Sequence, residues 1–208
     1  YLALAAVCIS STAFQVFFPY LFIYLGNVLD LSVDSVLASL TTGTIVAAAV
    51  VIVVAVALII CMGKLIDRFG KEKFLVFSVV LYFAGLVATG FAKNVLTFII
   101  CMVPALLGWC LFSVAMNAAV RDFMPQGKVG AFQGIRMIFS VLIPMVVGPV
   151  IGNLVCRVSS VTYTNDYGVV TSAPGAVMFF AAAVVTVFIL WPVVVLIKKG
   201  FQVSEQEK

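Results

Sequence analysis

Long apolar segments separated by short polar connections make up most of this chain. Crossing a hydrocarbon layer about 30 Å thick requires roughly 20 residues of helix, and six segments approach or exceed that length. Apolar residues occupy most sides of these segments rather than alternate positions, which is typical of membrane helices and not of the strands of a membrane barrel. The predicted spans are Leu2–Val28, Val36–Met62, Phe74–Phe91, Val95–Val120, Ala131–Cys156 and Ala176–Ile197.

Composition supports a membrane location. Hydrophobic residues are 64% of the 208-residue chain and charged residues are 10%, whereas a soluble domain has roughly 25% charged residues. We therefore predict an all-α membrane protein, with a six-helix bundle over residues 1–197 in the lipid bilayer and a polar tail over 198–208. The sequence starts with Tyr1 rather than Met, and we expect the chain to be a piece of a longer protein.

Basic residues predict the orientation in the membrane. Short loops rich in Lys and Arg stay in the cytoplasm, so both termini are predicted to be cytoplasmic. The net charge of +4 then reflects topology and not nucleic-acid binding. The opposite side carries Lys93 and Arg157. The predicted cytoplasmic side carries Lys64, Arg68, Lys71, Lys73, Arg121, Lys128, Arg136, Lys198, Lys199 and Lys208.

Three prolines and one long loop add detail to these spans. Pro19, Pro104 and Pro144 each lie inside a predicted span and should bend or loosen it, because proline removes a backbone donor. The loop 157–174 is the longest connection on the outer side, and we expect it to form a short hairpin.

The loop between the second and third spans has a specific spacing of glycine and charge. Asp67 follows Gly63 by four residues and precedes Gly70 by three, with Arg68 and Lys71 beside it. The glycines allow a tight turn, and the basic residues hold the loop inside. This spacing resembles the signature G-x-L-x-D-R-x-G-[RK]-[RK] of the major facilitator superfamily, which lies between the second and third helices of each six-helix half.

The match to that signature has one departure and one alternative interpretation. Glu72 stands at the second basic position, and Lys73 follows one place later. The alternative is a solvated, positive-inside turn with no conformational role.

A second segment resembles the same family. The passage from Arg121-Asp122 through Gly134 to Gly148-Pro149-x2-Gly152 is similar to the fourth-to-fifth helix region of bacterial facilitator-type sugar permeases. Together the two resemblances imply the C-terminal half of a twelve-helix transporter in a bacterial plasma membrane. They imply a partner as well, the N-terminal six-helix half.

The family resemblance also implies a mechanism and a site. Two six-helix bundles rock around a solute near mid-membrane, which is alternating access, and the first and fourth helices of each half line the cavity. Buried amides offer both donors and an acceptor to solute hydroxyls, and an indole could stack against a sugar face. Such groups also bond neighbouring helices. The candidate substrate-binding residues are Gln15, Tyr20, Asn27, Trp109, Ser113 and Asn117.

A second group of residues is predicted to act in conformational change. Arg121, Asp122 and Arg136 lie near the cytoplasmic ends of the fourth and fifth spans, where they could form a charge-paired gate or anchor the helices at the interface. The loop residues Gly63, Asp67, Arg68, Gly70 and Lys71 are predicted to belong to the same conformational apparatus.

Missing residue types narrow the function. No charged residue is predicted at the middle of a span, where a charge is costly and usually functional. If transport is coupled to a proton or a sodium ion, that ion is therefore expected to bind in the other half, and a neutral solute such as a sugar or glycoside is favoured. With no histidine and no nucleophile beside a base, we expect neither an enzyme, nor a cofactor, nor a metal site. The alternatives are an exporter of amphipathic compounds, suggested by Phe14, Phe17 and Phe18, and a half-size bundle that does not transport.

Overall fold

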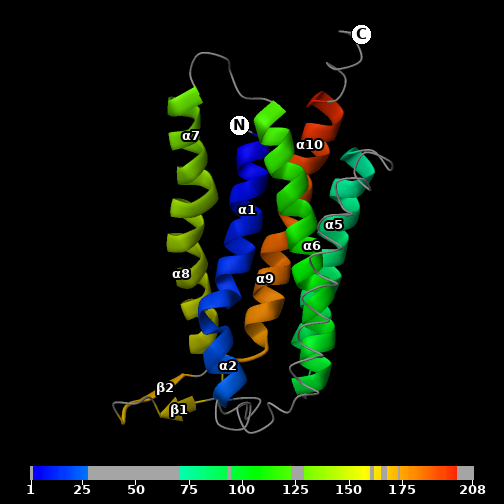
Figure 1. Ribbon diagram of the computed structural model, residues 1–208. Helices are drawn as coiled ribbons and strands as arrows, with labels where there is room; N and C mark the ends of the chain where they lie inside the picture. The colour runs from blue at the N-terminus through cyan, green and yellow to red at the C-terminus, as the bar shows by residue number, and fades with distance from the viewer. Residues whose placement is uncertain are drawn as a thin grey trace, which may run out of the picture.

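The protein is a bundle of long helices that lie side by side (Figure 1). The computed structural model describes residues 2–27, 71–92, 95–122, 129–159, 162–164, 168–172 and 174–200. Five helical segments in this part of the chain are long and apolar enough to cross a membrane. The predicted span Val36–Met62 lies outside the described residues.

The described helices follow the predicted spans closely. The first span is α1 (Leu2–Phe17), the 3-10 turn η1 (Phe18–Tyr20) and α2 (Leu21–Asn27). The third and fourth spans are α5 (Lys71–Gly90) and α6 (Val95–Asp122). The fifth is α7 (Val129–Met137), the π-helical segment η2 (Ile138–Leu142) and α8 (Ile143–Val158). The sixth is α9 (Val177–Val187) and α10 (Leu190–Gly200).

Prolines account for the interruptions of these rods. A proline lacks the N–H that would bond the carbonyl four residues earlier, and its ring crowds that carbonyl. Pro19 lies in the 3-10 turn η1, and Pro144 is the second residue of α8, two residues after the π-helical segment η2 ends. Pro192 stands four residues after Phe188, where α9 ends and a turn precedes α10. Pro104, in contrast, lies within the unbroken helix α6.

The ends of the helices agree with the predicted topology. The beginnings of α1, α5 and α7 and the ends of α6 and α10 lie at one end of the bundle (Figure 1). A small antiparallel hairpin lies at the other end, formed by β1 (Thr162–Thr164) and β2 (Val170–Ser172), with Tyr163 opposite Thr171. The hairpin expected in the outer loop is therefore present.

Two buried clusters of apolar side chains hold the bundle together. The first lies toward the beginning of α1 and includes Leu4, Leu75, Phe112 and Met116. The second lies toward the hairpin end and includes Phe17, Tyr24, Phe98 and Phe179, whose rings meet at centroid distances of 5.4–5.7 Å. Because lipid is as apolar as these side chains, close packing rather than water exclusion is what favours their association.

Small residues allow the closest helix contacts. A methyl group built at Gly85 would collide with Ala105, and one built at Gly108 would collide with the backbone of Tyr82, so α5 and α6 touch nearly backbone to backbone. Three buried hydroxyls of α5 and α9 are satisfied within their own helices. Ser78, Thr89 and Thr186 each donate to a carbonyl three or four residues earlier on their own helix, at 2.8 Å.

The rod formed by α7, η2 and α8 is the most exposed of the described spans. Its outward side carries large apolar residues that nothing in the described bundle covers. Gly130 and Gly134 have open space around them, whereas Gly148 and Gly152 pack against α1 and η1. One side of this rod therefore packs on α1, and the other is free for lipid or another bundle.

Candidate functional site

Three of the predicted solute residues lie on one side of α6. Trp109, Ser113 and Asn117 follow one another at intervals of four, and residues spaced by four lie on one face of a helix. All three are partly buried. Trp109 contacts Phe14 of α1, so this face of α6 is turned toward α1.

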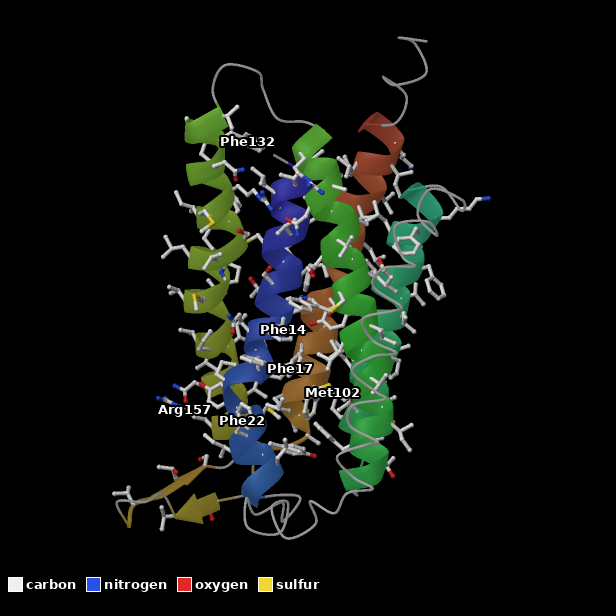
Figure 2. All side chains as sticks on the ribbon, viewed as in Figure 1. Phe14, Phe17, Phe22, Met102, Phe132 and Arg157 are labelled. Carbon is white, nitrogen blue, oxygen red and sulfur yellow. The ribbon has the colours of Figure 1, made fainter. Side chains whose placement is uncertain are left out.

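The indole of Trp109 belongs to an aromatic stack between α1 and α6. Its ring lies on Phe14 at a centroid distance of 4.3 Å and an interplanar angle of 17°. Phe14 is also stacked with Phe18 at 4.8 Å, and it meets Phe17 edge-on at 5.4 Å. Figure 2 shows Phe14 and Phe17 between the helices, well away from both ends of the bundle. One face of the Trp109 ring is thus occupied by protein.

The polar atom of this indole lacks a hydrogen bond. The Trp109 Nε1–H is buried and has no hydrogen-bond partner among the described residues. A buried donor without a partner costs free energy, and native proteins keep few of them. Such a donor is available to a bound solute or to water.

Asn117 is held in one orientation by two hydrogen bonds. Its Nδ2 donates to the carbonyl oxygen of Ser113 at 2.7 Å. Its Oδ1 accepts from Nη2 of Arg136 at 2.6 Å, across from α6 to α7. Arg136 also donates from Nη1 to Oε1 of Gln133, at the long distance of 3.4 Å. A predicted solute residue and a predicted gate residue therefore form one cluster.

Gln15 and Tyr20 lie at a different contact, where α1 and η1 cross α8. A methyl group built at Gly148 would meet the Gln15 side chain, and one built at Gly152 would meet the Tyr20 ring. The Tyr20 hydroxyl donates to the carbonyl oxygen of Pro149 at 3.0 Å. In this conformation Tyr20 joins two helices.

Several predicted residues lie beyond what the structure describes. The side chains of Asn27, Lys71 and Asp122 belong to described helices, but their positions are not among the described ones. The loop residues Gly63, Asp67, Arg68 and Gly70 lie outside the described residues entirely. Arg121 is exposed in the last turn of α6.

Two participants were missed by reasoning from the sequence. Gln133 lies three residues before Arg136, a spacing that places both on one helix face and could have indicated their contact. Phe14 was noted as part of an aromatic group, but its stacking on Trp109 depends on the packing of α1 against α6 and has no local signal. No group of three or more possible metal ligands occurs among the described residues.

Comparison with known proteins identifies a family. A sequence model of the Major Facilitator Superfamily matches residues 1–205. Searches of curated proteins and of solved structures gave no match.

Proposed function

Because the chain belongs to the major facilitator superfamily, we propose that it is one six-helix half of a secondary transporter for a small, hydroxyl-rich solute. Transport across a membrane agrees with the family and with the long apolar helices. Membership of a family of transporters also agrees with the expectation that the chain is not an enzyme. We also propose that the chain is the C-terminal half and that the transporter works by alternating access.

The observation that carries the proposal is the row of polar and aromatic groups on α6. Trp109 supplies an unpartnered buried N–H, and Asn117 supplies an amide whose orientation is fixed by two hydrogen bonds. Hydroxyl groups bind such donors and acceptors directly. The aromatic stack beside them offers an apolar surface to the carbon face of a sugar ring.

The partner in this proposal is a second six-helix bundle, the N-terminal half. Support comes from the rod formed by α7, η2 and α8, whose outward side is apolar and has open glycines. A coupling proton or sodium ion would bind in that second half. The protein would lie in a bacterial plasma membrane with both termini in the cytoplasm.

The loop Gly63–Lys73 would act in the conformational change, together with Arg121 and Asp122 near the end of α6. Asp67→Asn tests this role. We expect slower uptake with little change in KM, because the variant alters a conformational step and leaves the α6 row intact. Uptake kinetics in cells check the result. An unchanged maximal rate would mean that the loop is simply a solvated turn.

The proposal as a whole is tested by uptake of labelled sugars and glycosides by the complete transporter in cell membranes. Saturable uptake of one of these solutes, lost on Asn117→Ala, supports it. No uptake of any of them by a correctly assembled protein would count against the solute class.

A second function is favoured by the aromatic stack alone. Phe14, Phe18 and Trp109 form a continuous aromatic stack, which would suit contact with an amphipathic compound carried outward. Export of a fluorescent amphiphile from loaded vesicles, without saturable sugar uptake, would favour this alternative.

A further inference from the structure

The cluster of Arg136, Asn117 and Gln133 contains a positive charge that faces the bundle. We propose that the Arg136 guanidinium is the recognition site for an acidic group, a carboxylate or a phosphate, on the transported solute. This inference rests on the proposed function and narrows its hydroxyl-rich solute to one that carries an acidic group. It also replaces the view of Arg136 as a gate or anchor.

The depth of Arg136 is the first argument. Arg136 lies seven residues after Val129, where α7 begins, and a helix rises about 1.5 Å per residue. Its Cα is therefore about 10 Å into a helical rod that continues to Val158. The side chain is partly buried and reaches across to α6 instead of extending to the end of the rod. A charged side chain directed toward the bundle interior is costly and usually has a functional role.

The partners of the guanidinium are the second argument. Both of its hydrogen bonds among the described residues end on neutral amide oxygens, at Asn117 and Gln133. Amide oxygens orient a guanidinium but do not neutralise it. The fork of Arg has five N–H donors, and its geometry matches a carboxylate or phosphate that binds through two oxygens.

The position of the cluster is the third argument. Asn117 is on the same face of α6 as Trp109, eight residues away, which is about 12 Å along a helix. A solute whose polar ring meets Trp109 and Ser113 could therefore place an acidic group at Arg136.

The experiment compares neutral and acidic sugars in the complete transporter. The labelled panel contains two neutral solutes, glucose and methyl glucoside, two carboxylates, gluconate and glucuronate, and one phosphate, glucose 6-phosphate. Comparing the carboxylates with the phosphate shows which acidic group the site prefers. We expect uptake of an acidic member. Arg136→Gln should raise its KM about tenfold or more, because hydrogen bonds to charged groups contribute strongly, and Arg136→Lys should raise it less. Arg157→Gln, an exposed arginine near the hairpin end (Figure 2), should leave KM unchanged.

A second variant keeps the arginine in place. Asn117→Asp has nearly the same shape and puts a carboxylate at the atom that Arg136 now contacts, so it should neutralise the site and weaken acidic solutes as strongly as Arg136→Gln. Gluconate, glucuronate and glucose 6-phosphate should also be tested for thermal stabilisation of the purified complete transporter in detergent. At least one should stabilise the wild type and none should stabilise Asn117→Asp.

The possible outcomes separate this inference from the proposed function. Uptake of neutral sugars alone, or equal effects of Arg136→Gln on neutral and acidic solutes, would overturn the inference and leave sugar transport standing. Stabilisation of the wild type by an acidic sugar and not of Asn117→Asp, without uptake of any member of the panel, would support the anion site and refute the proposed transport. No stabilisation and no acidic uptake would also overturn the inference.

Discussion

The single residue that most shapes the proposed site is Trp109. Its ring is already stacked on Phe14, so a solute would meet its other face or its edge. The edge carries the Nε1–H that has no partner among the described residues. Stacking holds the ring in place, and the unpartnered donor is the group left for a ligand.

Trp109→Phe separates these two roles. The ring that packs on Phe14 is retained, so we expect little loss of folding stability. The donor is removed, so the KM for a hydroxylated solute should rise about two- to tenfold, the effect of one neutral hydrogen bond. Uptake kinetics and thermal unfolding in detergent measure the two effects.

The matched control for this variant is Trp191→Phe, because Trp191 is exposed on α10. It should alter neither KM nor stability. A Trp109→Phe variant that transports like the wild type would remove the indole N–H from the site.

Tyr20 is a predicted solute residue whose hydroxyl donates to the carbonyl oxygen of Pro149 in the described conformation. Tyr20→Phe should lower the free energy of unfolding by about 1 kcal/mol, the usual contribution of one hydrogen bond. Thermal or denaturant unfolding in detergent checks this value. The variant should leave KM unchanged, and a raised KM with normal stability would restore Tyr20 to the solute site.

At the scale of elements, contact between helices depends on a few glycines. The rod formed by α7, η2 and α8 has two pairs of them, and the pairs have different surroundings. Gly148 and Gly152 meet α1 and η1, whereas Gly130 and Gly134 meet open space. Glycines spaced by four let another backbone approach closely, and among the described residues such a neighbour is present at Gly148 and Gly152.

Gly152→Ala should therefore be destabilising. The added methyl group would collide with the Tyr20 ring and the Val16 carbonyl oxygen, and overpacking costs about 1–3 kcal/mol. Thermal unfolding of the purified protein measures the loss. Gly134→Ala is the control, because it adds the same methyl group where the described bundle leaves space. Equal loss in both variants would show that Gly134 is also packed, as it would be against a second bundle.

The helices themselves could be predicted because their signal is local. The lengths of the apolar segments predicted the ends of five helical spans to within a few residues of those in the structure. Prolines account for η1 and for the break between α9 and α10. The π-helical segment before Pro144 was not predicted. A proline in the sequence indicates that a helix will bend, but it does not indicate whether the backbone near the bend will be α-, 3-10 or π-helical.

The candidate site was predicted less well, because its partners come from different helices. The spacing of Trp109, Ser113 and Asn117 indicates a shared face. It does not reveal that Asn117 would meet Arg136, nineteen residues later on α7. That contact depends on how α6 and α7 are placed in the bundle, and no local pattern reports it.

At the scale of the whole molecule, the chain is an all-α membrane protein of the major facilitator superfamily. Within the described part, the candidate solute residues whose side chains are described lie on α1, η1 and α6, and Asn117 contacts Arg136 of α7. The buried hydroxyls of α5 and α9 bond within their own helices. The chain's large exposed apolar residues lie on outward sides of the helices. The half-transporter proposed above would place its solute beside α6 and lipid against the exposed apolar sides.

The most direct test of this account is saturable uptake of the labelled sugar panel by the complete transporter, with Asn117→Ala and Arg157→Gln measured beside the wild type. We predict uptake of at least one member. Asn117→Ala should reduce this uptake about tenfold or more, because it removes the amide that holds Arg136 and that would contact the solute. Arg157→Gln should transport normally. Uptake that Asn117→Ala leaves unchanged, or no uptake by a correctly assembled protein, would contradict the central claim that the α6 face binds a transported sugar-like solute.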